Sequence, residues 1–168
     1  MEIIIALVIL FLVLALIFCL TSIKYVKPHN ILIIERFNKF NRTVISKTVL
    51  IPFIEKIKLT LPLDAQKIEL PPQSIITTDN TIINIGTIIT YQITDPVKAT
   101  YEMESVQRGI ELMTNKMIHE ILEKMDYDTA INSKKEIRNN VKNILTEAVV
   151  TWGITIWEFE FSTFAKNI

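Results

Sequence analysis

The strongest hydrophobic pattern in the chain is an unbroken apolar run at its N-terminus. Residues Ile3–Leu20 are all apolar, and the weakly polar continuation reaches Ile23 before the first lysine. A helix of about 20 such residues spans the hydrocarbon core of a bilayer. Because neither proline nor glycine interrupts the run, we expect a straight transmembrane anchor over 1–23, followed by a juxtamembrane linker over 24–30.

A cleavable signal peptide is the alternative interpretation of this segment. Such a peptide begins with basic residues, whereas Glu2 is the only charged side chain before Lys24. Lys24 and Lys27 directly follow the run, and cytoplasmic flanks are enriched in basic residues. We therefore expect an uncleaved, single-pass membrane protein with a cytoplasmic C-terminal part. Cys19 could accept a palmitoyl chain near the membrane edge, but a small apolar helix residue is the simpler interpretation.

Beyond the linker, β-branched and alternating patterns predict a series of strands. Ile31–Phe37 has the pattern of a buried strand, and Asn38–Asn41 is typical of a turn. The clearest alternation covers Thr81–Thr94, where one set of alternate positions is mainly apolar and the other is mixed. We expect Pro71–Pro72 to end the preceding strand and Asp79–Asn80 to form a turn. The other segments expected to be extended are 49–53, 57–61, 66–70, 74–78 and 154–161.

Between the long strand and the last one, the pattern changes to that of amphipathic helices. Apolar residues recur every three or four positions over 106–125 and again over 137–152. Ser133 and Glu136 have capping-box spacing, and Gly153 stands where a left-handed C-cap is expected. This order of elements predicts an α+β fold, with the helices on one face of a mainly antiparallel sheet. The two predicted apolar stripes are Val106, Ile110, Met113, Met117, Ile121 and Met125, and Ile137, Val141, Ile144, Leu145, Ala148 and Trp152.

Composition and charge narrow the classes of function. The 168 residues include 18 basic and 18 acidic side chains, so the formal net charge is zero. This balance gives no indication of a nucleic-acid-binding protein. The single cysteine rules out an internal disulfide and a cysteine-based metal site. The length fits one domain, which we place over 31–168.

No motif in the chain predicts catalysis. His29 and His119 lack a second ligand at helical or loop spacing, and the glycines are too sparse for a phosphate-binding loop. No G-x-S-x-G or S-x-x-K motif is present. Glu158 and Glu160 share one side of a predicted strand, where a paired-carboxylate site is conceivable, but alternating strand charges are usually solvated. We therefore expect no catalytic, cofactor-binding or metal-binding residues.

Two further groups of side chains could serve either packing or binding. Met113, Met117 and Met125 could form an adaptable binding groove, although packing in the core is the better interpretation. Trp152 and Trp157 are candidates for the core or for an interface. Neither group predicts chemistry of its own.

Six short segments, in register and covering about Val26 to Ile156, resemble one known family. They are Val26–Pro28, Ile34–Thr43, Ile51–Ile57, Pro71–Asn80, Tyr91–Ala99 and Trp152–Ile154. The second is similar to the family pattern V-x-E-R-F-G-K-Y-x-R-T, the fourth to P-P-Q-x-V-I-T-K-D-N and the fifth to Y-x-V-x-D-P-x-K-A. The chain thus resembles the stomatin/prohibitin/flotillin family, also called SPFH or Band 7, and most closely its stomatin-like branch.

The resemblance implies a function in organising membranes. Members of the family form large membrane-bound homo- or hetero-oligomers, often rings or cages. They organise membrane microdomains and hold or regulate membrane proteases and channels. The domain has no known catalytic residues, so the resemblance implies a scaffold and no enzyme. The expected partners are membrane lipids, copies of the chain or SPFH relatives, and a membrane protease or channel.

The chain departs from the family pattern in three places. The Pro-Gly pair expected before the I-P-F segment is absent, with Ser46–Lys47 near its place, and the N-terminal run lacks the proline of hairpin anchors. The long Ala/Glu/Arg-rich helix that drives ring assembly is replaced by Phe161–Asn167. Subunit contacts are then expected on the exposed faces of Thr81–Thr94 and Ile154–Phe161. Two alternatives stay open: a truncated adaptor that docks on and modulates a full-length relative, and a membrane-anchored enzyme with an unrecognised site.

Overall fold

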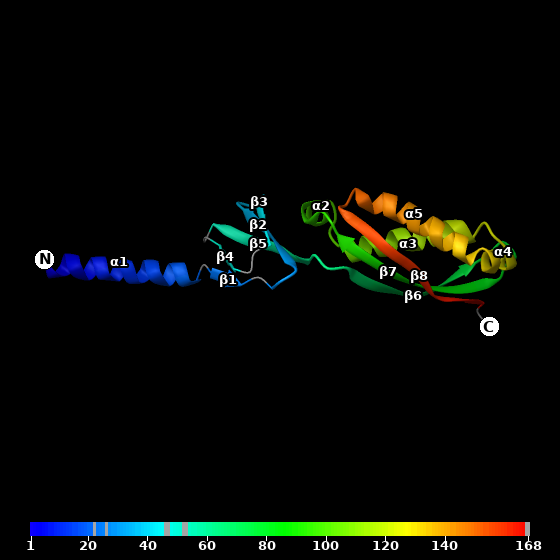
Figure 1. Ribbon diagram of the computed structural model, residues 1–168, viewed down its shortest axis with the longest axis horizontal. Helices are drawn as coiled ribbons and strands as arrows, with labels where there is room; N and C mark the ends of the chain where they lie inside the picture. Colours follow the sequence, from blue (N-terminus) through cyan, green and yellow to red (C-terminus); the bar gives the residue numbers. More distant parts are fainter. Residues whose placement is uncertain (22, 26, 46–47, 52–53, 167–168) are drawn as a thin grey trace. The chain divides into compact units, whose positions relative to one another are not determined.

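The computed structural model describes residues 1–21, 23–25, 27–45, 48–51 and 54–166. The chain divides into two compact units, Met1–Leu61 (unit 1) and Pro62–Ile168 (unit 2). Both units contain strands, and helices occur in each (Figure 1). The predicted α+β class is therefore confirmed, while a single domain over 31–168 stays a prediction.

The N-terminal apolar run forms helix α1 (Glu2–Thr21). The side chains of residues 3–14 are all exposed. Among the described residues, however, no helix combines the length and the apolar character needed to cross a membrane. The prediction of a transmembrane anchor over 1–23 is therefore wrong for the described residues. The predicted cytoplasmic position of the C-terminal part depended on that anchor and has no support without it. The side chain of Cys19 lies outside the described part, so its modification stays a prediction.

The strands of unit 1 form two small sheets. Strands β1 (Ile23–Tyr25) and β4 (Thr48–Leu50) pair antiparallel. Strand β2 (Asn30–Arg36) lies between β3 (Lys39–Val44) and β5 (Glu55–Pro62). The interior of β2 is buried, as predicted.

The turn after β2 differs from the prediction. It lies at Phe37 and Asn38, whose φ angles of 52° and 59° are left-handed, and β3 already begins at Lys39. The predicted turn over Asn38–Asn41 was therefore placed too late, because two left-handed residues are enough to reverse the chain. Ser46–Lys47 and Pro52–Phe53, where a turn and an extended segment were expected, lie outside the described residues.

Unit 2 is built on an antiparallel sheet in the order β6–β7–β8 (Figure 1). Strand β7 (Ile82–Ile93) is central, and the predicted alternation is confirmed, because Ile83, Ile85 and Ile89 are almost fully buried. Strand β6 (Gln66–Ile76) passes through Pro71–Pro72 instead of ending there. Its register shifts between Leu70 and Gln73, and such an irregularity accommodates prolines that cannot donate to the ladder.

Four helices separate β7 from β8 (Ile154–Lys166) in the described chain. They are α2 (Pro96–Tyr101), α3 (Val106–Leu122), α4 (Tyr127–Asn132) and α5 (Lys134–Val150). Figure 1 shows α3 and α5 along the same side of the sheet, and they pack on each other and on β6 and β8, respectively. The predicted helices on one face of an antiparallel sheet are confirmed for this unit, whereas the short helices α2 and α4 were missed.

On both helices the buried residues recur with the predicted period. The buried face is rotated about the helix axis relative to the predicted apolar stripe. In α3, the fully buried positions include Thr114 and Ile118, while Met113 and Met117 are half-buried, as is Met125 just after the helix. In α5 the exposed Ile144 was wrongly included, and the buried Val149 was missed. The complete buried sets are Ile110, Thr114, Ile118 and Leu122 in α3, and Ile137, Val141, Leu145 and Val149 in α5.

Two of the segments that carried the family resemblance meet at the end of α5. Gly153 adopts a left-handed φ of 70°, as predicted. Its carbonyl oxygen accepts hydrogen bonds from the backbone N–H groups of Thr94 and Asp95, both at 2.9 Å. The Asp95 carboxylate in turn caps α2 by accepting from the N–H groups of Val97 and Lys98. The D-P and W-G-I segments therefore form one structural joint between β7, α2, α5 and β8.

The predicted capping box at α5 does not form in the described chain, although its first residue has the predicted N-cap position. Ser133 is the N-cap residue, but its side chain makes no capping hydrogen bond among the described residues. Ser133 also closes α4, so its backbone N–H donates to the carbonyl of Thr129 at 2.9 Å. With two helices meeting at one residue, the backbone of Ser133 is not in the extended conformation that usually aims an N-cap side chain at its helix.

Candidate functional site

The two histidines lie in different units of the chain. His29 belongs to unit 1 and His119 to unit 2. His119 lies on α3, where its Nδ1 is 3.4 Å from Oε1 of Glu123. This is a surface pair at i,i+4 spacing, of the kind that supports a helix weakly. Within the described ranges, no group of three or more histidine, cysteine, aspartate or glutamate side chains is placed to hold a metal ion.

The two glutamates of the last strand face solvent. Glu158 and Glu160 alternate with the buried Phe159 and the half-buried Phe161 on β8. Both carboxylates line a surface groove whose other wall is α5. They have cations and aromatic rings around them, with no nucleophile or histidine in the groove lining. This environment fits a binding surface better than a paired-carboxylate active site.

The groove between α5 and β8 is a concave surface with several charged side chains in its lining. Two adjoining hollows share Arg138 and Glu160 and together form what we call the α5–β8 groove. Arg138 and Lys142 lie one turn apart on α5, and neither forms an ion pair with a described carboxylate. The lining of the whole groove is Asn132, Lys134, Lys135, Arg138, Asn139, Lys142, Trp157, Glu158, Phe159, Glu160 and Phe161.

The aromatic residues of unit 2 divide between core and surface. Trp152 is half-buried at the end of α5, beside Gly109 and Met103. Trp157 is 60% exposed, and its Nε1 donates to Oε1 of Gln92 at 3.1 Å. The structure thus assigns Trp152 to packing and places Trp157 in the lining of the α5–β8 groove.

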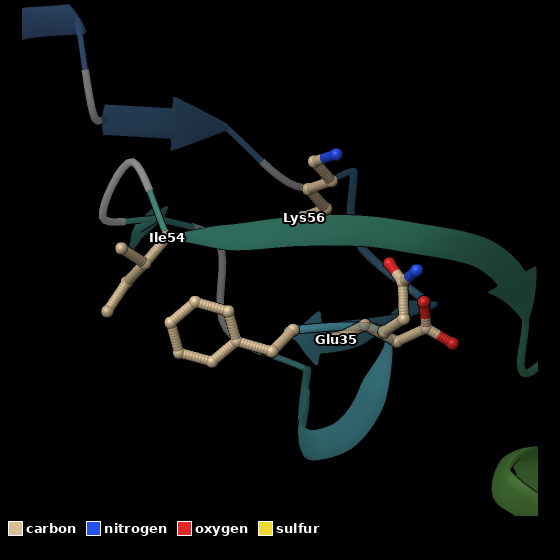
Figure 2. A pocket seen from close by; sticks show the side chains of 5 residues that line it. Glu35, Ile54 and Lys56 are labelled. Carbon is tan, nitrogen blue, oxygen red and sulfur yellow. The ribbon is translucent and has the colours of Figure 1, made fainter.

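A second hollow lies in unit 1, where the turn after β2 faces the start of β5. We call it the turn pocket; its lining consists of Glu35, Phe37, Asn38, Ile54 and Lys56. Figure 2 shows Ile54 and Lys56 at the start of β5 and Glu35 on the neighbouring strand β2. Phe37 is 77% exposed although its backbone is left-handed. A large apolar side chain in a strained turn contributes little to the stability of its own unit, so the turn pocket is a candidate contact surface.

Electrostatic interactions hold the turn between β6 and β7 against the start of α4. The Thr77 hydroxyl donates to Asp79, and this hydrogen bond holds the pKa of Asp79 below its ordinary value. The pKa of Asp126 is likewise lowered, first by the hydrogen bond from the side chain of Thr129. Both groups are fully exposed to solvent and serve to order a turn and a helix start. They are therefore structural.

The cationic wall of the α5–β8 groove was missed in the sequence. None of its four cations, Lys134, Lys135, Arg138 and Lys142, was among the predicted site residues. A signal was present, because positions 134, 138 and 142 recur every four residues and so share a face of the helix. The rotation of α5 about its axis decides which element lies beside this cationic face. The predicted apolar stripe placed that rotation wrongly, because it included the exposed Ile144.

Comparison with known proteins shows the family. The family described as SPFH domain / Band 7 matches residues 24–164. An uncharacterized protein of Methanothermobacter thermautotrophicus is 32% identical over 161 residues, which cover 95% of this chain and 48% of that protein. Stomatin-like protein 2, mitochondrial, of Rattus norvegicus is 26% identical over 141 residues, or 83% of this chain and 40% of the relative. Stomatin-like protein stl-1 of Caenorhabditis elegans is 26% identical over 141 residues, covering 83% and 44%.

This chain belongs to the SPFH domain / Band 7 family, which confirms the resemblance found in the sequence. The family is one of membrane-associated scaffold proteins that are generally non-enzymatic. The chain spans less than half the length of the curated relatives cited above. The activities and partners of the whole relatives are therefore matters of proposal for this chain.

Proposed function

We propose that this chain is a subunit of a stomatin-type scaffold that assembles with copies of itself or with SPFH relatives at a membrane. In that assembly it would organise a membrane microdomain and regulate a membrane protease or channel. The observation that carries the proposal is helix α1, whose residues 3–14 are apolar and exposed throughout. Apolar surface of this extent is unfavourable in water, so membrane lipid or the α1 helices of other copies must cover it.

The turn pocket supports the same proposal from unit 1. Phe37 and Ile54 add exposed apolar side chains, 77% and 44% exposed, next to the charged Glu35 and Lys56. An apolar centre with a charged rim is the composition of many protein contact surfaces. Once membrane association raises the local concentration of subunits, even a weak contact of this kind is enough to close an oligomer.

Membrane association is tested by removing the apolar character of α1. Vesicle flotation of the Leu7→Glu/Phe11→Glu variant should show most of the protein lost from the vesicle fraction, because each change adds a charge where an exposed apolar side chain stood (60% and 71% exposed). The wild type should float with the vesicles.

The matched control removes two exposed apolar side chains from unit 2. Leu112→Glu/Ile144→Glu changes side chains that are 61% and 42% exposed, and it should float like the wild type. Equal flotation of all three proteins, or a wild type that stays in solution, would remove the basis of the proposal.

A further inference from the structure

Strand β8 is an edge strand, so one of its two sides has no strand partner among the described residues. It pairs with β7 on one side and, in the part of the chain that the structure describes, with no strand on the other. Its thirteen residues, Ile154–Lys166, include no proline. The opposite edge, β6, carries Pro71–Pro72 at an irregular register, which is a usual protection against strand addition. The two edges of this sheet are therefore not equivalent, and only β8 offers a long proline-free ladder.

Two irregularities in the pairing of β8 define where an added strand would fit. The register with β7 shifts between Thr90 and Tyr91 and again between Gly86 and Thr87. Between these shifts, the residues Glu158–Phe161 are in regular register. This regular stretch is also the part of β8 that lines the α5–β8 groove. The free ladder and the groove thus coincide.

The helix wall of the groove is cationic. Lys134, Lys135, Arg138 and Lys142 line it, and none of them forms an ion pair with a described carboxylate. The Lys134 ammonium lies 5.3 Å from the centroid of the Phe164 ring, which keeps one end of this wall beside β8. Charges of one sign along a groove attract a partner of the opposite sign.

The strand wall restricts the partner further. Glu158 and Glu160 are exposed on one side of β8, whereas Phe159 and Phe161 lie on the other. A segment that was acidic at every position would place carboxylates against these two glutamates, which is unfavourable for directly opposed strand residues. A segment with acidic residues at alternate positions avoids this repulsion, and the exposed Trp157 ring offers a contact for an apolar residue between them.

We propose that the α5–β8 groove binds an extended segment of a partner protein that is acidic at alternate positions and adds to the sheet as a strand beside β8. Main-chain hydrogen bonds to the edge would supply affinity, and the cationic wall would select the acidic residues. The site goes beyond the proposed scaffold function, because it names the chemistry of a partner and does not require α1 or a membrane.

The test is a binding titration of the full chain in mild detergent with a fluorescent synthetic peptide of alternating glutamate and valine. The wild type should bind, and Arg138→Glu should weaken binding by about tenfold or more, because it places a like charge at the centre of the cationic wall. Lys142→Glu should weaken it in the same direction. Lys124→Glu, the same charge change on an exposed lysine outside the groove, should change the affinity by no more than about twofold.

A second peptide separates strand addition from simple charge attraction. Alternating glutamate and proline has the same charge, but it lacks the backbone N–H at every second residue and its proline rings hinder a continuous strand ladder. It should therefore bind at least about tenfold more weakly. Equal binding of the two peptides, or equal loss in Arg138→Glu and Lys124→Glu, would overturn the proposal. A folded wild type that binds neither peptide would overturn it too, and would leave the groove to another occupant such as a second copy of this chain. Vesicle flotation tests the scaffold proposal, and the peptide titration tests the groove. Loss of flotation would therefore not change the interpretation of peptide binding.

Discussion

Replacing Gly153 by alanine should lower the free energy of unfolding of unit 2 by about 3 kcal/mol. The residue has a φ of 70°, where a side chain adds backbone strain. An added Cβ would also lie 2.5 Å from the carbonyl oxygen of Asp95 and 2.6 Å from its Cβ. Because the first contact is with backbone, relief requires moving the joint that holds β7, α2, α5 and β8 together. Urea unfolding followed by the fluorescence of Trp152 and Trp157, which both lie in unit 2, measures the change.

Gly109→Ala is the matched control for this prediction. Its added Cβ would approach Cε of Met103 to 2.4 Å, but this atom is the far end of a flexible side chain. The site is inside α3, where alanine is favoured over glycine by roughly 0.5–1 kcal/mol. The two effects offset each other, so stability should stay within about 1 kcal/mol of the wild type. Equal losses in Gly153→Ala and Gly109→Ala would contradict the account of the joint.

Truncation of Leu145 to alanine should cost unit 2 about 3 kcal/mol. Leu145 is fully buried on α5, the helix that packs on both α3 and β8. Its removal leaves a cavity between two helices and a sheet that cannot close without moving an element. The same urea titration gives the value.

The neighbouring Ile144 provides the control and tests the rotation of the helix. Both residues belong to the apolar stripe expected from the sequence, yet Ile144 is 42% exposed. Ile144→Ala should therefore cost less than about 1 kcal/mol. If Ile144→Ala were the more damaging change, the orientation of α5 in the structure would be wrong, and with it the composition of the α5–β8 groove.

The order of elements in unit 2 could be predicted because its signals are local. The alternation in β7, the helical period of α3 and α5, and the left-handed Gly153 each depend on residues close together in the chain. The path of β6 through Pro71–Pro72 could not be predicted in this way. Prolines end a strand in general, but an edge strand with an irregular register tolerates them, and edge position is a property of the assembled sheet.

The candidate surfaces depended even more on tertiary structure. The recurrence of Lys134, Arg138 and Lys142 is visible in the sequence, but its meaning comes from the edge strand β8 beside it. The α3 stripe illustrates the same limit, because Thr114 is fully buried whereas the more apolar Met113 is only half-buried. A period fixes the spacing of buried positions, whereas the facing elements decide which residue on the helix is innermost.

The resemblance to the SPFH family could be recognised from motifs, and the structure gives two of them a physical basis. Asp95 and Pro96 start α2 as N-cap and first helical residue, and Gly153 provides the left-handed turn that accepts hydrogen bonds from that same segment. The E-R-F segment, by contrast, ends in a left-handed and exposed Phe37. The Phe37 ring lies 5.6 Å from the guanidinium carbon of Arg36, and in the scaffold that we propose it would supply an apolar contact to a neighbouring subunit.

The native mass of the full chain in mild detergent tests the scaffold account most directly. Light scattering or a native gel should show one discrete particle of many subunits, because the exposed apolar surfaces of α1 and the turn pocket are then covered by other copies. A particle with the mass of a single chain plus detergent, unchanged as the protein concentration rises, would contradict self-assembly.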